Sequence, residues 1–136
     1  MAYIRKNREL SSRNKGNNGE DVASKYLENK GYNIVRRNYR KVWGEIDIIA
    51  SKDKKIHFIE VKSVTFKDLD GIMLNYHKPE DNVHGLKMKH IRRMIQTYFD
   101  EYNIGLDMEF NFHIICVYLN MKTRRAKVRM IENIIL

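Results

Sequence analysis

Two runs of β-forming residues lie close together near the middle of the chain, and they constrain the fold more than any other feature. Residues 45–51 and 56–64 are rich in Ile, Val and Phe, and only four residues separate them. Such a composition favours strands, and four residues is a common length for the loop of a β-hairpin. The chain is therefore expected to contain an antiparallel hairpin at its centre.

The segments on either side of this hairpin alternate between helical and strand patterns. Apolar residues recur at helical spacing between Asn18, a suitable N-cap, and Gly31, which can end a helix. A second helical pattern covers residues 86–102. Further strands are predicted at 32–39, 110–119 and 126–131, and a long polar loop, which includes Pro79, is predicted at 65–85. This order predicts a single α/β domain.

The length and charge of the chain limit its organisation and its partners. At 136 residues the chain suits one domain, which we expect at residues 17–136, after a flexible basic arm at residues 1–16. Lys and Arg number 26 against 17 Asp and Glu, which gives a formal net charge of +9. This excess favours polyanions, with nucleic acid as the first candidate and a basic surface that serves only solubility as the alternative.

The cysteine content and the hydropathy indicate a compartment. The single cysteine, Cys116, lies in an apolar run and is expected to be a core residue, which is compatible with a reducing environment. The sequence has no run of about 18 apolar residues, and its basic start lacks the apolar stretch of a signal peptide. We therefore expect a cytoplasmic protein with no membrane partner.

Charged residues interrupt the two central strands at corresponding positions. In the hairpin register Asp47 lies opposite Glu60, and side-chain alternation places Glu45 and Lys62 on the same face. The residues expected on the opposite face are Ile46, Ile48, Ile59 and Val61. Two carboxylates about 4 Å apart repel by roughly 4 kcal/mol at an effective dielectric constant of about 20, and one lysine cannot neutralise three acids. A divalent cation would offset this charge, and oxygen ligands select Mg²⁺ or Mn²⁺, an arrangement that suits phosphodiester cleavage.

Several motifs along the chain occur together in a known family. They are Gly19-Glu20, Arg37-Asn38-Tyr39-Arg40, Gly44-Glu45-Ile46-Asp47, Glu60-Val61-Lys62 and Pro79-Glu80-Asp81-Asn82-Val83. In this combination the chain resembles the YraN family, also called UPF0102, over most of its length from Gly16 onward. The resemblance implies the PD-(D/E)xK, restriction endonuclease-like fold, similar to archaeal Holliday junction resolvases. This fold has an αβββαβ core whose central mixed sheet is flanked by helices, here with an extra C-terminal edge strand.

The resemblance also implies a catalytic set of Glu20, Asp47, Glu60 and Lys62. Asp47 and Glu60 would bind Mg²⁺ or Mn²⁺, and Lys62 would orient the attacking water and contact the scissile phosphate. Glu20 would be an outer or second-metal ligand, although its spacing fits equally well a first-turn acid that stabilises the helix dipole. Glu45 is an accessory residue and a candidate ion-pair partner for Lys62.

The chain departs from the family pattern in two places, in the strand at 110–119 and after the Glu-Val-Lys motif. His113 stands where the family tends to have an acid, and Ser63 and Val64 follow the Glu-Val-Lys motif where the family tends to have Arg or a similar residue. Neither departure touches the catalytic set, so the departures put substrate choice in question more than catalysis.

Basic residues outside the catalytic set are candidate phosphate contacts. They are Lys87, Lys89, Arg92 and Arg93 in the second helical pattern, and Arg5, Arg8 and Arg13 in the arm. For the helix, a solvated face is an equally good explanation. Trp43, which precedes the acidic strand, is expected in the core rather than stacked on a base.

These features together predict a Mg²⁺-dependent endonuclease that hydrolyses phosphodiester bonds of nucleic acid, with DNA preferred and branched DNA included. Within the same chemistry, the alternative is a junction-specific resolvase that acts as a homodimer. From another class of protein, the alternative is a non-catalytic adaptor that binds nucleic acid and retains the nuclease fold.

Overall fold

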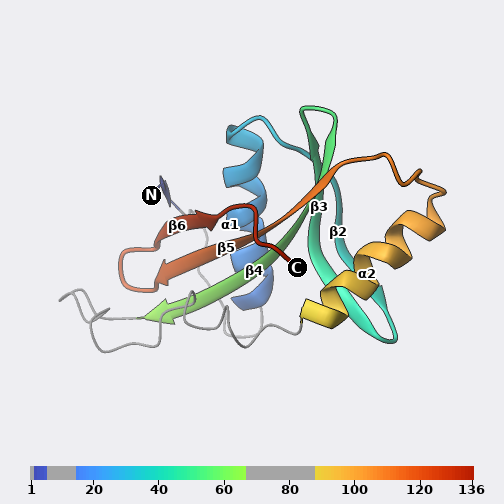
Figure 1. Cartoon of the computed structure of the whole chain (residues 1–136). Helices are drawn as coiled ribbons and strands as arrows, with labels where there is room; N and C mark the ends of the chain where they lie inside the picture. Colours follow the sequence, from blue (N-terminus) through green and yellow to red (C-terminus); the bar gives the residue numbers. More distant parts are fainter. Residues whose placement is uncertain (1, 6–14, 67–87) are drawn as a thin grey trace.

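A computed structural model describes residues 2–5, 15–66 and 88–136 of the chain (Figure 1). The described elements are β1 (Ala2–Arg5), α1 (Lys15–Asn29), β2 (Asn33–Lys41), β3 (Gly44–Lys52), β4 (Lys55–Phe66), α2 (Met88–Glu101), β5 (Phe110–Asn120) and β6 (Arg125–Ile131). The predicted loop at 65–85 and Lys87 lie outside the described residues, apart from Thr65 and Phe66, which belong to β4.

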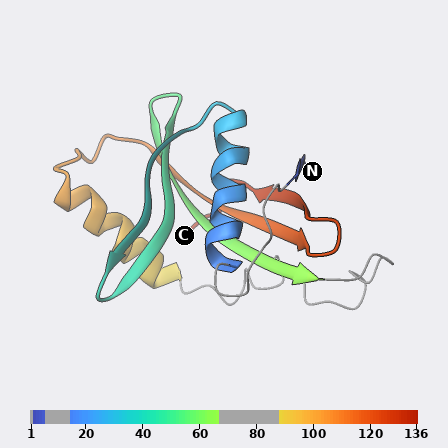
Figure 2. The same ribbon diagram turned by 180° about the vertical axis from the view of Figure 1, so that it is seen from behind.

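The strands form one sheet in the order β1-β6-β5-β4-β3-β2. Among the described strands, β4 and β5 are parallel, and every other neighbouring pair is antiparallel. Helix α1 lies on one face of the sheet and α2 lies on the other, as the two opposite views show (Figures 1 and 2). This arrangement confirms the predicted αβββαβ core with a mixed sheet flanked by helices.

The N-terminal and C-terminal strands differ in one respect from the prediction. The predicted strand at 126–131 is present as β6, but β1 pairs with its outer side from Ala2↔Val128 to Arg5↔Arg125, so β6 does not form the edge. An uncovered β6 would leave a row of backbone N–H and C=O groups unpaired, and β1 satisfies them. The first residues of the predicted arm therefore belong to the sheet.

Helix α1 begins earlier than its sequence pattern predicts and ends where expected. It starts at Lys15, so Asn18 lies inside the helix and is not its N-cap. At its end the backbone N–H of Tyr32 donates to the carbonyl oxygen of Leu27 (3.0 Å), and that of Gly31 donates to Glu28 (3.0 Å). This pair of bonds is a Schellman motif, and Gly31 adopts the positive φ of 92° that the motif requires.

Each face of the sheet has its own apolar core. Under α1 the buried residues include Val22, Ala23, Leu27, Ile48, Ile59, Ile115, Val117, Ala126 and Val128. Under α2 they include Ile46, Phe58, Ile91, Met94, Ile95, Phe112, Ile114 and Cys116. Complete burial of one large apolar side chain is worth about 1.5–3 kcal/mol, so both helices are held mainly by these faces. The predicted core position of Cys116 is confirmed.

Neither described helix, α1 or α2, combines the length and the apolar character that a membrane span requires.

A pair of histidines is buried on the α1 face of the sheet. The backbone N–H of Asn133 donates to Nδ1 of His113 (3.0 Å), so the proton of this ring sits on Nε2, which lies 2.9 Å from Nδ1 of His57. Nε2 of His57 in turn donates to the carbonyl oxygen of Lys52 (3.2 Å). All four ring nitrogens are thereby satisfied with both rings neutral. Burial lowers the pKa of both histidines, that of His113 to about 4.

Acid should therefore destabilise the protein through His113. In the unfolded chain a histidine takes up a proton near its ordinary pKa of about 6.5, whereas His113 stays neutral down to about 4. Its contribution to the free energy of unfolding is complete above about pH 6.5 and falls by roughly 1–2 kcal/mol as the pH decreases towards 4. Denaturant unfolding over this range measures the effect, which His113→Asn should reduce. His90→Gln, at an exposed position on α2, is the control, and the same pH dependence in both variants would contradict the prediction.

Candidate active site on the central strands

At Asp47, the regular alternation of the side chains of strand β3 between the two faces of the sheet is interrupted. Ile46 packs in the α2 core and Ile48 in the α1 core, so the prediction that these two residues share a face is wrong. In β2, Asn38 lies between the pairs Arg37↔Ile48 and Tyr39↔Ile46, at the level of Asp47, and has a φ of 54°. A residue in this left-handed conformation interrupts the regular alternation of the strand. Asp47 therefore sits at an irregular point of the sheet.

The side chain of Asp47 is directed at β4. It is 6% exposed, and its Oδ2 accepts a hydrogen bond from the backbone N–H of Val61 (2.8 Å). Strands β3 and β4 are paired as far as Ile48↔Ile59, so Asp47 and Glu60 occupy the next positions along the two strands. The structure thus brings Asp47 next to Glu60, as the hairpin register predicts.

The carboxyl groups of Asp47 and Glu60 lie close enough to perturb each other's pKa. Burial raises the pKa of both groups, and the negative charge of Asp47 raises that of Glu60 further. Two buried carboxylates in contact cannot both be ionised without strong repulsion, so the pair retains a proton near neutral pH.

Lys62 provides the nearest cation. Its Nζ lies 3.6 Å from Oε1 of Glu60, and its side chain is 29% exposed. Ile56 and Phe58 pack in the α2 core, so alternation along β4 places Glu60 and Lys62 on the α2 face as well. The positive charge of Lys62 lowers the pKa of Glu60, but burial and Asp47 outweigh it.

Glu20 approaches this group from α1 without completing it. Its charge raises the pKa of Asp47, but its Oε2 is 3.5 Å from Nη2 of Arg37, whose Nη1 also pairs with Asp21 at 2.8 Å. Within the described ranges, no three His, Cys, Asp or Glu side chains are grouped so that they could hold a metal ion together. Of the predicted metal ligands, Asp47 and Glu60 therefore lie close together. The role of Glu20 as a further ligand stays a prediction.

Arg37 is a residue of this site to which the sequence analysis gave no role. It bridges β2 to the first turns of α1, and its buried Nε has no hydrogen-bond partner among the described residues. Its position in the motif Arg37-Asn38-Tyr39-Arg40 was the only signal in the sequence.

Glu45 lies at the margin of the site, where its negative charge adds to burial in raising the pKa of Asp47. Its Oε2 accepts from Nε of Arg40 at 2.7 Å, and both side chains are about half exposed or more. The predicted ion pair with Lys62 is therefore wrong, because Glu45 sits beyond the irregularity at Asp47 and faces its neighbour in β2 instead.

The basic residues of α2 are exposed, but they do not meet the acidic pair. Lys89, Arg92 and Arg93 lie on the solvent side of the helix, and the guanidinium of Arg93 stacks over the ring of Trp43 at 4.8 Å. Trp43 is 39% exposed and donates to Oγ1 of Thr97 (3.3 Å), so its predicted place in the core is wrong. Lys87, Arg8 and Arg13 lie outside the described residues, and nucleic-acid contacts by all these groups stay predictions.

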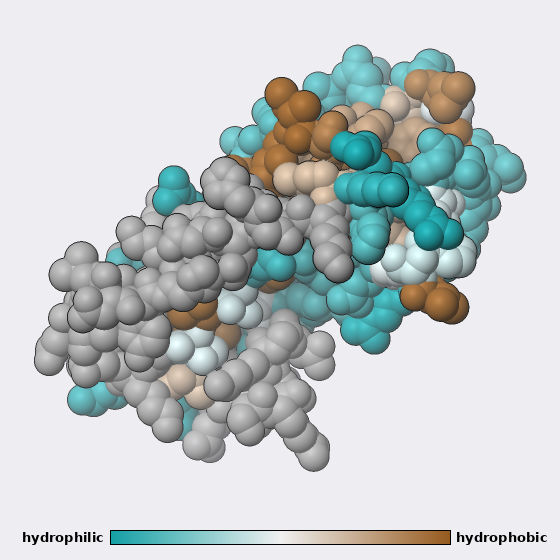
Figure 3. Space-filling view, turned by 60° about the horizontal axis from the view of Figure 1, so that its bottom comes forward, coloured by the Kyte–Doolittle hydropathy of each residue, from teal (hydrophilic) through white to brown (hydrophobic). Residues whose placement is uncertain are grey.

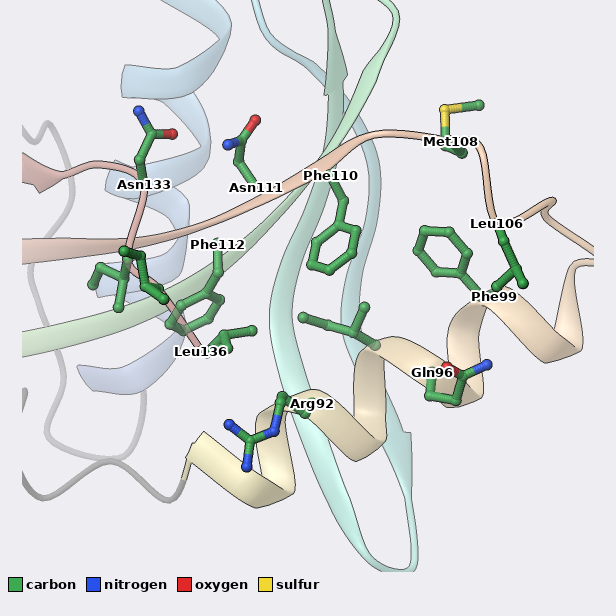
Figure 4. A pocket seen from close by; sticks show the side chains of 13 residues that line it. Arg92, Gln96, Phe99, Leu106, Met108, Phe110, Asn111, Phe112, Asn133 and Leu136 are labelled. Atoms are coloured by element: carbon green, nitrogen blue, oxygen red, sulfur yellow. The ribbon is translucent and has the colours of Figure 1, made fainter.

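A separate cavity of about 530 Å³ lies between α2, the start of β5 and the C-terminal residues (Figure 4). Phe99, Phe110 and Leu136 line it together with Arg92, and its wall is largely apolar. Hydrophobic surface adjoins hydrophilic side chains at this end of the molecule (Figure 3). Asp47, Glu60 and Lys62 do not line the cavity, so it is distinct from the candidate active site.

The order of elements and the position of the acids define the class of protein. A helix, three antiparallel strands, a second helix and a parallel fourth strand form the core of the restriction endonuclease-like fold. In this core, the second and third of these strands carry Asp47, Glu60 and Lys62.

Comparison with known sequences assigns the family. The sequence model described as "Uncharacterised protein family UPF0102" matches residues 19–129. A UPF0102 protein of Campylobacter lari is 38% identical over 119 residues, which are 88% of this chain and 91% of the relative. A UPF0102 protein of Caldicellulosiruptor saccharolyticus is 31% identical over 124 residues, which are 91% of this chain and 98% of the relative. A UPF0102 protein of Chloroherpeton thalassium is 34% identical over 111 residues, which are 82% of this chain and 80% of the relative. The chain belongs to the UPF0102 family, as its motifs predict.

The close approach of α1 to β4 can be tested at Gly19. A Cβ at this position would lie 3.0 Å from both Cβ and Oγ of Ser63. We expect Gly19→Ala to destabilise the protein by about 1 kcal/mol, because the crowding outweighs the better helix propensity of alanine. In a double-mutant cycle Ser63→Gly should recover at least about 0.5 kcal/mol of this loss. Strictly additive free energies of unfolding would contradict the contact.

The repulsion within the acidic pair can be tested with Glu60→Gln, which removes a charge and keeps the shape. Because the folded state raises the pKa of Glu60, wild-type stability should fall as the pH rises above the ordinary carboxyl range. In EDTA at about pH 8.5, Glu60→Gln should be more stable than wild type by roughly 1–2 kcal/mol, and the difference should shrink near pH 5.

The same variant tests metal binding by a measurement independent of activity. Added Mn²⁺ should raise the Tm of wild type and leave that of Glu60→Gln nearly unchanged, because ligands that bind only the folded state stabilise it. Glu109→Gln, at an exposed acid paired with Lys55, is the control and should behave as wild type in both experiments. Equal responses of all three proteins would exclude this pair as the metal site.

Proposed function

We propose that this chain is a divalent-metal-dependent endonuclease that hydrolyses phosphodiester bonds of nucleic acid, with DNA as the preferred substrate. The observation that carries the proposal is the pair of neighbouring carboxyl groups of Asp47, which is buried, and Glu60 on adjacent strands, with Nζ of Lys62 3.6 Å from Glu60. Buried acids held against each other are unfavourable for stability alone. Such perturbed groups are common at functional sites.

The donor chemistry of the pair fits Mg²⁺ or Mn²⁺. Both ions prefer oxygen ligands, and Mg²⁺ in particular is commonly held by one or two carboxylates, with waters and substrate phosphate completing its shell. Asp47 and Glu60 would hold the ion, and Glu20 could join at an outer position only by leaving Arg37. When bound, such an ion acts as a Lewis acid that lowers the pKa of a water molecule and offsets charge on the phosphoryl oxygens.

The remaining residues of the site would position the reactants. The backbone N–H of Val61 fixes the carboxyl group of Asp47, so this ligand needs little reorganisation when substrate arrives. Lys62 would orient the attacking water and donate to the scissile phosphate. Arg37, which pairs with Glu20 and Asp21, would hold the first turns of α1 against β2 beside the acidic pair.

One question about the substrate is left to experiment, namely whether the protein cuts junctions in preference to other DNA. A junction-specific resolvase would act as a homodimer, since a four-way junction needs two cuts, and would cut junctions in preference to duplex DNA. The cytoplasmic location expected from the sequence is part of the same proposal.

The direct test compares cleavage of branched, single-stranded and duplex DNA, and of single-stranded RNA, with Mg²⁺ or Mn²⁺. We expect metal-dependent cutting by wild type and a loss of at least about 100-fold in Asp47→Asn and Lys62→Ala, because each removes a metal ligand or a phosphate contact. Glu109→Gln serves as the control with one exposed charge removed, and it should cut as wild type does.

The non-catalytic adaptor makes the opposite prediction. An adaptor would bind the same nucleic acids with equal affinity in wild type, Asp47→Asn and Lys62→Ala, and none of the three proteins would cut any substrate. That result would overturn the proposed activity.

A further inference from the structure

The turn between β2 and β3 consists of two apolar residues. Lys41 pairs with Gly44, so the turn residues are Val42, which is fully exposed, and Trp43, which is 39% exposed. Two-residue hairpin turns favour Asn, Asp and Gly with a positive φ, and neither Val42 nor Trp43 has a positive φ. These residues therefore suit neither the turn nor its exposure to solvent, and such departures from local rules are expected at functional sites.

The turn is held in place on α2. Nε1 of Trp43 donates to Oγ1 of Thr97 (3.3 Å), whose hydroxyl donates to the carbonyl oxygen of Arg93 (2.8 Å). The guanidinium of Arg93 lies over the indole ring, 4.8 Å from its centroid. A Cβ at Gly44 would lie 3.1 Å from Cγ of Met94, so the glycine permits this close packing. The ring is thus oriented before any ligand binds, and a ligand that stacks on it has little ordering cost to offset.

The exposed part of the Trp43 side chain is its aromatic surface. Its one polar group, the indole N–H, is bonded to Thr97, and Arg93 covers one face of the ring. The exposed surface therefore belongs to the rest of the ring, and the apolar side chain of Val42 stands beside it in the turn. Such a surface suits a flat aromatic ligand.

The charges around the turn favour a polyanion. The two basic residues of β2 nearest the turn are neutralised, Arg40 by Glu45 (2.7 Å) and Lys41 by Glu101 (2.9 Å). Three basic residues of α2 are exposed and form no ion pair with a residue in the described ranges: Lys89, Arg92 and Arg93. An aromatic ring beside unpaired cations is the arrangement that holds single-stranded nucleic acid, because bases stack on the ring and the cations attract the backbone.

The turn also lies on the strand that carries Asp47. The pairing of β3 with β4 ends at Ile48↔Ile59, whereas its pairing with β2 continues to Gly44. The end of the β2–β3 hairpin therefore diverges from β4, as both opposite views show (Figures 1 and 2). Trp43 precedes Asp47 by four residues, which is about 13 Å along a strand. At about 3.4 Å for each stacked nucleotide, a base at Trp43 would lie within about four nucleotides of a phosphate at Asp47.

We propose that Val42 and Trp43, named here the stacking turn, bind an unpaired base of nucleic acid. The base stacks on the ring of Trp43, Val42 extends the apolar contact, and Arg93 contacts the backbone of the same strand. This inference rests on the proposed function and specifies the substrate class, which is nucleic acid with unpaired bases near the cut. Because every base has an aromatic face, the stacking turn selects the structure of the substrate and not its sequence.

Trp43 is the only tryptophan of the chain, so its own fluorescence tests the proposal in the wild-type protein. The ligands are a labelled DNA single strand, a duplex, and a duplex with a single-stranded tail, all in EDTA to prevent cutting. Anisotropy of the label measures binding, and the indole emission measures stacking, because a base stacked on indole quenches it. We expect the single strand and the tailed duplex to quench the emission as they bind, and the plain duplex to leave it nearly unchanged.

Two results of this titration would overturn the stacking turn. One is binding of the single strand, measured by anisotropy, with no change in the indole emission. The other is the absence of binding to all three ligands.

Variants of Trp43 give a second measurement. In Trp43→Ala the Kd for the single strand should rise about tenfold, whereas the Kd for duplex should stay within about twofold. Trp43→Phe keeps an aromatic face and should recover most of the affinity for the single strand. The matched control is Tyr102→Ala, because Tyr102 is also an exposed ring of which an arginine, Arg36, covers one face. This control should bind as wild type does.

The outcomes that contradict the variants' prediction are equally specific. Equal weakening by Trp43→Ala and Tyr102→Ala, or equal weakening for single strand and duplex, would overturn the stacking turn. A loss of self-association in Trp43→Ala, measured by sedimentation velocity, with unchanged nucleic-acid binding would identify the turn as a contact between protein copies and overturn the proposal. Thermal unfolding of each variant monitors its fold, and the titration of wild type does not depend on it.

The two proposals can fail separately. Metal-dependent cutting by wild type, without quenching by the single strand, would overturn the stacking turn and leave the nuclease standing. Quenching by the single strand, in a protein that cuts no substrate with Mg²⁺ or Mn²⁺, would support the stacking turn and overturn the nuclease.

Discussion

The structure depends on one strand that serves as core and as site at the same time. Along the α2 face of β4, Ile56 and Phe58 are packed under the helix, and the next two side chains on that face are Glu60 and Lys62. The strand is aligned with β5 from Ile56↔Phe110 to Phe66↔Asn120, so its conformation is fixed on both sides of this change from apolar to charged. The apolar half holds the charged half in place, which is why two carboxyl groups can be kept close together despite their repulsion.

The sequence predicted this arrangement where local rules decide the outcome. The loop expected at residues 52–55 is in fact a two-residue turn of Asp53 and Lys54, since Lys52 and Lys55 pair with each other. The register is the same in both cases, so the hairpin and the two-residue period of a strand were sufficient to place Asp47 beside Glu60. They failed one residue away, at Ile46, because the positive φ of Asn38 belongs to the neighbouring strand and has no counterpart in the hydrophobic pattern. The ion pair predicted between Glu45 and Lys62 is wrong for the same reason, because only a regular strand would place the side chain of Glu45 on the face of Lys62.

Long-range pairing was the other limit of the sequence. Nothing in the basic start of the chain indicates that Ala2–Arg5 pairs with β6, because β-pairing over more than 100 residues depends on where an edge is available rather than on composition. Trp43 was placed in the core by its size, whereas the structure shows an exposed ring that stacks with Arg93. Arg37 lies in a family motif, but the sequence does not indicate its partners. Only the structure shows that α1 places Glu20 and Asp21 within ion-pair distance of it.

The parallel pairing of β4 and β5 also determines when the site can form. Hairpin contacts such as Asp47 with Glu60 are local, whereas Lys62 and Cys116 become neighbours only after the chain from Phe66 to Phe110 has crossed the sheet with α2. Local pairs close early during folding and crossover pairs close late. Because the entropy of closing a loop rises slowly with its length, doubling the connection would cost only about 0.6 kcal/mol. Insertions between β4 and α2 would therefore weaken the finished protein only slightly, and they would leave the pairing of β4 with β5 and of β5 with β6 unchanged.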